Sequence, residues 1–165
     1  MEFWGTVPQW ITAVVAVGAI VVAVISINSQ REIARKRAAM DFFTKTEMDK
    51  NTLDQHRDYK KSLAEFEKYK GREDGLTLFA STTEYLKIRD YLNLHELMSV
   101  GIKLEVFDDD VCYDFWAGEL ARACRDTREL IAFVQALSGE AETYCELMKV
   151  QKSWSEKDAK QGRVH

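Results

Sequence analysis

The pattern of apolar and polar positions divides the chain into an apolar N-terminal stretch and a long amphipathic remainder. Residues 7–27 read VPQWITAVVAVGAIVVAVISI and contain no charged side chain. A helix of this length spans roughly 30 Å at 1.5 Å per residue, which is the thickness of the hydrocarbon core of a bilayer. The pattern therefore predicts a single transmembrane helix over residues 7–27, preceded by a short external segment, residues 1–6.

Two features of this stretch favour a retained anchor over a cleaved signal peptide. The preceding segment, MEFWGT, carries no positive charge, and the apolar run is longer than a typical signal-peptide core and lacks a clear small-residue cleavage site. Trp4 and Trp10 lie at its N-terminal edge, where aromatic side chains anchor helices at the membrane interface.

The distribution of charge predicts the orientation of the span. Residues 1–30 contain no Lys or Arg, whereas the following segment REIARKR supplies four basic residues, Arg31, Arg35, Lys36 and Arg37. The positive-inside rule then places the helical domain, residues 28–156, in the cytoplasm and the N-terminus outside. In a bacterium this membrane would be the inner membrane. The basic cluster could act only as this topology signal or could also contact anionic lipid headgroups.

Small side chains follow one face of the predicted span at steps of four and three residues. They are Thr12, Ala16, Ala19, Ala23 and Ser26. Small residues at this spacing allow two helices to approach closely, so the stripe predicts a homo-oligomer formed through the span. The alternative is that an alanine-rich segment produces such a stripe by chance.

After the span, apolar positions recur at helical spacing and no stretch shows sustained alternation, which predicts an all-α domain. We expect a helical bundle of about four to five helices with a polar tail at the end. The expected ranges are 29–50, 53–70, 76–104, 111–137 and 140–152 for the helices and 157–165 for the tail.

Local signals mark the expected helix ends. Thr52 and Gln55 fit a capping box, and residues 71–75 (GREDG) are typical of a loop. Residues 108–110 (DDD) are expected to cap the fourth helix; a divalent cation is the alternative, although the ligand spacing of an EF-hand is absent. Gly139 is expected to end this helix in a left-handed conformation.

Composition narrows the classes of function. The chain has 165 residues, a net charge of −4 and three cysteines without a CxxC pair. The acidic balance does not favour nucleic acid as a partner, and the cysteines are expected to be buried free thiols. Because the sequence carries no motif for phosphate binding, hydrolysis or zinc binding, we predict no metal and no cofactor.

Three polar residues share one face of the otherwise apolar third helix. Arg89, Asn93 and Glu96 lie at positions i, i+4 and i+7. Because burying polar groups without partners is costly, we expect a hydrogen-bonded cluster that docks helices, with Arg37 and Asp41 of the first helix as partners. A functional pocket is the alternative interpretation.

Arg89 and His95 also resemble the R-x(4–6)-H signature of HEPN ribonucleases, which are compact helical bundles. The resemblance implies that these two residues would activate a ribose 2′-hydroxyl and assist the leaving group across a dimer. Histidine titrates near neutral pH, which suits this chemistry. The alternative is a buried core histidine, and the motif lies farther from the end of the domain than in HEPN proteins.

A longer resemblance covers roughly residues 8–140. The segments ARKRAAMDFF (34–43) and YLNLHELMSVGI (91–102), followed by an acidic turn, resemble a family of uncharacterised bacterial and bacteriophage proteins, a domain of unknown function. The matching positions are Arg37, Ala38, Asp41, Phe42, Leu92, Asn93, Glu96, Gly101 and Ile102. The resemblance implies an N-terminally anchored helical domain and supplies no activity.

Two functions follow from these patterns. The first is a membrane-tethered helical interaction or regulatory module without catalysis, in a prophage or phage-defence setting. Its partners would be the lipid bilayer and an unidentified protein. The second is a membrane-tethered HEPN-like ribonuclease that uses Arg89 and His95.

Overall fold

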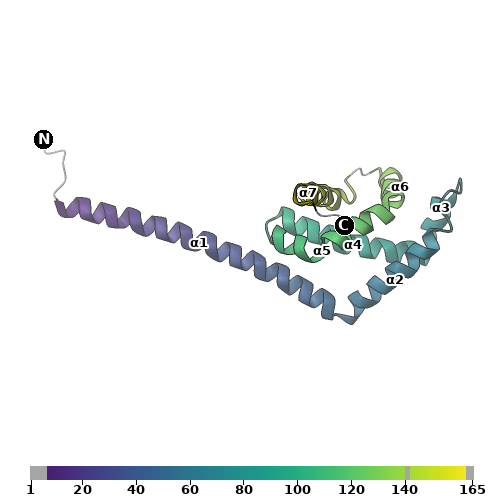
Figure 1. The fold of residues 1–165 in the computed structure, drawn as a ribbon, viewed down its shortest axis with the longest axis horizontal. Helices are drawn as coiled ribbons and strands as arrows, with labels where there is room; N and C mark the ends of the chain where they lie inside the picture. The colour runs from purple at the N-terminus through teal and green to yellow at the C-terminus, as the bar shows by residue number, and fades with distance from the viewer. Residues whose placement is uncertain (1–6, 140–141, 163–165) are drawn as a thin grey trace.

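A computed structural model describes residues 7–139 and 142–162, and every regular element in these ranges is a helix. The elements are α1 (Val7–Met48), α2 (Lys50–Phe66), α3 (Gly75–Ala80), α4 (Thr83–Lys103), α5 (Asp109–Asp126), α6 (Arg128–Ser138) and α7 (Cys145–Gln161). Figure 1 shows α1 as a long rod that projects from a bundle formed by the other helices. The predicted all-α class, with one apolar N-terminal helix followed by a bundle, is confirmed.

The helix α1 continues without interruption from the apolar segment into the bundle. It has 42 residues, which corresponds to a length of about 63 Å. Side chains 9–30 are exposed on all sides, and the first buried residue of α1 is Ala39, followed by Phe43. Within the described part of the chain, α1 is the helix whose length and composition would allow it to cross a membrane.

The boundary between α1 and α2 differs from the predicted one. The helix α2 begins at Lys50, so Thr52 lies inside it and the capping box predicted at Thr52 and Gln55 is wrong. The hydroxyl of Thr52 instead donates to Oδ2 of Asp49, at 3.4 Å, the residue between the two helices. The backbone carbonyl of Asp49 accepts hydrogen bonds from the N–H groups of Thr52 and Leu53, both at 3.1 Å.

The expected helix over residues 76–104 is two helices, α3 and α4. Thr82 separates them in an extended conformation, and its hydroxyl accepts a hydrogen bond from the backbone N–H of Tyr85. This break allows the buried ring of Phe79 to contact both Phe66 of α2 and Tyr85 of α4. Two aromatic contacts on different helices therefore outweigh the continuous helical pattern.

The expected helix over residues 111–137 is also divided, at Thr127. The buried hydroxyl of Thr127 donates to the carbonyl of Ala123 at 2.6 Å, a backbone contact that bends helices. The apolar residues at helical spacing in this stretch are buried from Trp116 as far as Val134, whereas Leu137 is 70% exposed. Gly139 has φ +66°, which confirms the left-handed cap.

The last helix is longer than expected and starts later. It covers Cys145–Gln161 rather than residues 140–152, so residues 157–161 of the predicted polar tail are helical. Side-chain contacts with the start of α5 hold this end. The indole of Trp154 donates to Asp109 at 2.8 Å, and Lys157 pairs with Asp110 at 2.7 Å.

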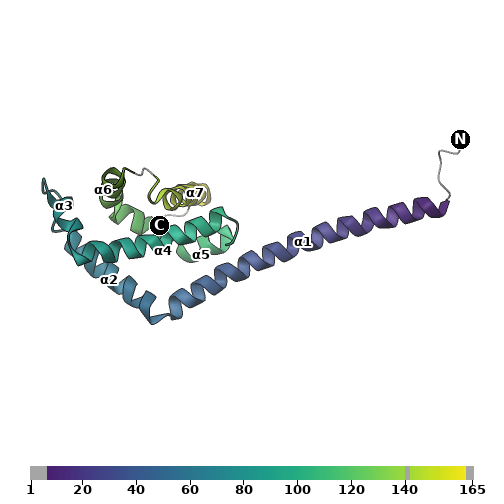
Figure 2. The same cartoon turned by 180° about the vertical axis from the view of Figure 1, so that it is seen from behind.

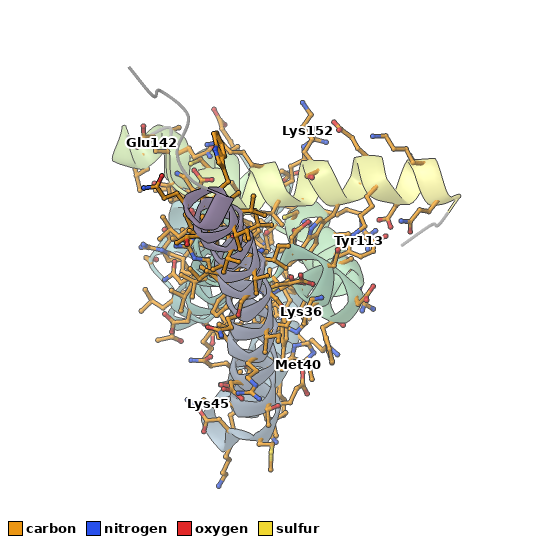
Figure 3. All side chains as sticks on the ribbon, turned by 90° about the vertical axis from the view of Figure 1, so that its left-hand side faces the viewer. Lys36, Met40, Lys45, Tyr113, Glu142 and Lys152 are labelled. Carbon is orange, nitrogen blue, oxygen red and sulfur yellow. The ribbon has the colours of Figure 1, made fainter. Side chains whose placement is uncertain are left out.

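The helix α4 is the centre of the bundle. It packs against α2 on one side and α7 on the other, while α1 packs on α2 and α5 (Figure 2). Figure 3, which looks along α1, shows α7 lying across the bundle at a steep angle to α1. Cys112 and Cys124 are buried free thiols, as expected, and burial raises the pKa of each to about 12. Cys145 is a free thiol but is only partly buried, so the expected burial is wrong for this cysteine.

Candidate functional site

The polar residues of α4 meet the start of α7. The carboxylate of Glu96 accepts hydrogen bonds from the backbone N–H groups of Leu147, at 2.7 Å, and Glu146, at 3.4 Å. Tyr144, the residue before α7, has a left-handed backbone and provides no side-chain cap. Glu96 therefore satisfies open N–H groups at the N-terminus of α7 and places a negative charge at the positive end of the helix dipole.

The other two residues of this polar face, Asn93 and Arg89, hold the buried side chain of Tyr144. Its hydroxyl donates to Oδ1 of Asn93 at 3.2 Å. The guanidinium of Arg89 also bonds to Tyr144, which raises the pKa of Arg89, and lies 5.6 Å from the centre of the Tyr85 ring. These contacts dock α7 on α4, which agrees with the structural interpretation of the cluster.

The first-helix partners expected for this cluster are not part of it. Arg37 and Asp41 have exposed side chains on α1, and α1 packs chiefly on α2 and α5 rather than on α4. The prediction that they pair with Arg89, Asn93 or Glu96 is therefore wrong. Sequence spacing identified the polar face of α4 but not the helix that covers it, because that choice depends on how the chain turns back.

Replacing Glu96 with alanine is expected to lower the free energy of unfolding by about 0.5–2 kcal/mol, the usual cost of losing a helix cap. The loss arises because two N–H groups of α7 would no longer have their acceptor. Thermal unfolding of the full chain in detergent micelles measures the effect. Asp90→Ala, an exposed acid on the same helix, is the matched control, and equal melting temperatures for the two variants would contradict the capping role.

His95 is part of the core. Its ring is buried, stacks on Trp116 with centroids 4.7 Å apart, and has Nδ1 2.9 Å from the carbonyl oxygen of Tyr91. Burial lowers the pKa of His95 to about 4, so the ring is neutral at physiological pH. Arg89 lies about 120° away around the helix and faces Tyr144, so the two residues of the ribonuclease motif are not brought together.

A small cavity near His95 is lined by a hydrogen-bonded pair, His56 and Tyr91, that sequence reasoning missed. It has a volume of about 180 Å³ and lies between the end of α1, α2, α4 and α5. Nδ1 of His56 is 3.1 Å from the hydroxyl of Tyr91, whose ring stacks on Tyr59 at 4.0 Å. Burial raises the pKa of both tyrosines, so they are neutral. The spacing of His56 and Tyr59, one helical turn apart, was the signal available in the sequence.

A larger groove lies beside the segment of α1 that follows the apolar stretch. Its volume is about 860 Å³, and its walls are residues 28–38 of α1 and residues 104–106 of the turn between α4 and α5. Arg35 pairs with Glu105 of the turn at 3.4 Å, and Arg31 also lines the groove. Two of the four predicted basic anchor residues therefore face this groove.

The other predicted anchor residues have different surroundings. Lys36 bonds to Glu32 at 2.5 Å, and its pKa is raised by that bond and by the charges of Asp108 and Asp110. It lies on the side of α1 that faces α5 (Figure 3). Arg37 is exposed, Trp10 is exposed on the first turns of α1, and Trp4 lies outside the described residues.

The turn between α4 and α5 has a closely defined backbone. The carbonyl of Gly101 accepts hydrogen bonds from Val106 and Phe107, at 2.9 and 3.1 Å. A Cβ at Gly101 would lie 2.3 Å from the Phe107 ring, and that ring packs on Phe42 of α1 with centroids 5.0 Å apart. Only glycine at position 101 leaves room for this ring, which holds the turn against α1.

The acidic run that follows the turn has structural partners. Oδ1 of Asp108 accepts from the N–H of Val111 at 3.1 Å, which confirms the predicted cap of α5. Asp109 and Asp110 hold α7 through Trp154 and Lys157. Within the part of the chain that the structure describes, no group of three His, Cys, Asp or Glu side chains could hold a metal ion.

Comparison with known proteins places the chain in a family. The profile of a domain of unknown function, DUF4760, matches residues 13–154. The chain belongs to the DUF4760 family. No curated protein and no solved structure matches it. The matched range begins within the apolar part of α1 and ends in α7, so this DUF4760 domain includes most of the rod as well as the bundle.

The motif residues that carried the predicted resemblance largely build the DUF4760 fold. Leu92 is buried in the core, Asn93 holds Tyr144, and Glu96 caps α7. Gly101 makes room for Phe107, which packs on Phe42. These positions therefore define how α1, α4 and α7 dock, and they do not form a common pocket.

Proposed function

We propose that this DUF4760 protein is a membrane-tethered helical interaction module whose bundle is held at a fixed distance from the bilayer. The observation that carries the proposal is the continuity of α1. One helix bears both the exposed, uncharged segment 7–27 and the buried residues Ala39 and Phe43. Ala39 lies twelve residues after Ile27, about 18 Å along the helix, so no flexible linker separates an inserted segment from the bundle.

A rigid connection of this kind suits a regulatory or scaffolding role. Tilting, rotation or association of the spanning segment would move the bundle as one body, because α1 belongs to both. Self-association through the stripe formed by Thr12, Ala16, Ala19, Ala23 and Ser26 would then bring two bundles into a defined arrangement. All five side chains are exposed on α1, which supports this proposal.

A protein partner is supported by apolar side chains on the outside of the bundle. Leu86 and Leu97 are both exposed on α4, and their spacing of eleven residues places them on the same face, three turns apart. We propose that the module acts at the bacterial inner membrane with the N-terminus outside and the bundle in the cytoplasm. The basic segment after residue 30 supports this orientation. The motif resemblance supports a bacterial or phage setting, such as a prophage or phage defence.

Membrane fractionation of the full-length protein tests the anchor. The protein should sediment with membranes, resist extraction at high salt and high pH, and be released by detergent. A reporter that is active only in the cytoplasm, fused after His165, should be active. Recovery of the intact chain in the soluble fraction would contradict the anchor, and activity only of a reporter that requires the outer side would contradict the orientation.

The alternative, a HEPN-like ribonuclease, has a direct test of its own. Its two motif residues would have to meet at one site, whereas His95 is buried against Trp116 and Arg89 binds Tyr144. We therefore expect purified protein to leave RNA intact. Cleavage that is lost in the Arg89→Lys variant, with the fold preserved, would favour the ribonuclease.

A further inference from the structure

The turn between α4 and α5 carries two apolar side chains that the bundle does not cover. Leu104 is 65% exposed and Val106 is 50% exposed. Figures 1 and 2 show that this turn forms the end of α4 and α5 nearest to the apolar half of α1. Two backbone hydrogen bonds to the carbonyl of Gly101 fix this turn. Within it, Glu105 has a left-handed backbone conformation, with φ +55°. The turn therefore presents these side chains in a defined position.

The groove beside the turn has a largely polar wall on α1 and a largely apolar wall on the turn. The polar lining residues of α1 are Asn28, Ser29, Arg31, Glu32 and Arg35, and on the turn Glu105 lies between Leu104 and Val106. Among the described residues, no carboxylate pairs with Arg31, whose side chain is exposed. Nε of Arg35 is buried without a hydrogen-bond acceptor, although another nitrogen of the same guanidinium contacts Glu105. Two guanidinium groups thus line the groove, and that of Arg31 has no carboxylate partner among the described residues.

The groove lies at the height expected for lipid phosphates. If the hydrocarbon core ends near Ile27, the headgroup layer extends for roughly 5–7 Å beyond it. This layer corresponds to about residues 28–32 of α1. Asn28, Ser29 and Arg31 lie within that range, and the long side chain of Arg35 can reach back toward it.

The acidic residues near the turn and in the groove all have partners within the chain. Asp108 caps α5, while Asp109 and Asp110 bind Trp154 and Lys157. Two acids line the groove: Glu105, which pairs with Arg35, and Glu32, which pairs with Lys36. Because each of these acids has a cationic or N–H partner, their repulsion of an anionic headgroup is reduced.

We propose that the α4–α5 turn is a second membrane-contacting element that binds an anionic phospholipid. Leu104 and Val106 enter the interfacial layer, and the lipid phosphate binds Arg31 and Arg35 in the groove. Bidentate binding of phosphate is the geometry for which guanidinium groups are suited, and basic residues close to a span attract anionic headgroups. This proposal rests on the proposed membrane anchor and adds a contact that would orient the bundle on the bilayer.

Depth-dependent quenching in proteoliposomes tests the apolar part. In the full chain with Cys145→Ser, an environment-sensitive fluorophore is attached to Leu104→Cys, to Ile20→Cys, or to Leu137→Cys, an exposed control on α6. Lipids with nitroxides near the headgroup should quench the label at position 104, lipids with deep nitroxides should quench the label at 20, and neither should quench that at 137. A label at 104 that behaves like the one at 137 overturns the turn contact, whereas an unquenched label at 20 overturns the anchor itself.

Vesicle composition tests the phosphate part. Quenching at position 104 should be stronger in vesicles with 30% phosphatidylglycerol than in phosphatidylcholine alone. The double variant Arg31→Gln, Arg35→Gln should lose this difference. The matched variant Arg122→Gln, Arg125→Gln, which removes two exposed arginines of α5, should keep it. Equal quenching in the two lipids, or an equal loss in both double variants, overturns binding of an anionic headgroup in the groove.

Discussion

Replacing Phe43 with alanine is expected to lower the free energy of unfolding of the bundle by about 3–5 kcal/mol, the range for deleting a buried aromatic ring. Phe43 is 2% exposed and is the main buried aromatic contribution of α1 to the core. Its ring centroid lies 5.3 Å from that of Trp116 and 5.0 Å from that of Phe115. Removing the ring leaves a cavity between α1 and α5, and it loosens the joint between the rod and the bundle.

Near-UV circular dichroism of the full chain in detergent micelles, followed through thermal unfolding, measures this effect. Met40→Ala is the matched control, because Met40 lies one turn earlier on the same helix and is 44% exposed (Figure 3). We expect the control to change stability by less than about 1 kcal/mol. Similar melting temperatures for the two variants would mean that Phe43 does not join α1 to the bundle.

Lowering the pH from 7 to 5 is expected to reduce stability by about 2 kcal/mol through His95 alone. Burial lowers the pKa of His95 to about 4, whereas an unfolded histidine titrates near 6.5. Between these values the unfolded chain binds a proton that the folded core excludes. The contribution of His95 is therefore complete above pH 6.5 and is lost as the pH falls toward 4.

The loss of stability between pH 7 and 5 can be assigned to His95 because of the groups that surround its ring. The ring faces Trp116, the Tyr91 carbonyl and, electrostatically, His56, and no carboxylate is among the causes of its shifted pKa. The acid with the most strongly lowered pKa is Glu146, at about 2, chiefly through its hydrogen bond from Lys103. Its stabilising contribution is fully present above about pH 4.5 and is lost only below that, so Glu146 does not cause a change in stability between pH 7 and 5.

The His95→Leu variant, which is similar in volume, separates this effect from other titrations. Its melting temperature should fall less than that of the wild type between pH 7 and 5, because leucine binds no proton in the unfolded chain. His56→Asn, which keeps a polar side chain beside Tyr91, should retain the wild-type pH dependence. Identical pH profiles for the wild type and His95→Leu would show that His95 is not buried as a neutral ring.

The two breaks in predicted helices show where the sequence pattern was insufficient. Thr82 and Thr127 lie in stretches whose apolar spacing continues across them, so periodicity alone predicted unbroken helices. Threonine can cap a helix or bond to the backbone inside one. The hydroxyl of Thr82 caps α4, and the hydroxyl of Thr127 bonds to a backbone carbonyl of α5. Which use applies depends on contacts such as that of Phe79 with Phe66, which are distant in sequence.

The candidate sites were also predicted only in part from the sequence. The polar face of Arg89, Asn93 and Glu96 followed from the helical period, but its partner helix did not. Tyr144 and the start of α7 lie about fifty residues later, beyond any local signal. The groove beside Arg31 and Arg35 could not be predicted either, because it exists only where the α4–α5 turn returns to α1.

By itself, the sequence determined the helical class, the long apolar segment of α1, the acidic cap of α5 and the burial of two thiols. These properties depend on composition and on residues within a few turns of each other, so their physical causes are local. The tertiary structure alone decided that His95 is a core residue, that Glu96 caps α7, and that Leu104 lies beside Arg31. Those outcomes depend on which helices meet, and the meeting of helices is set by the packing of the whole core.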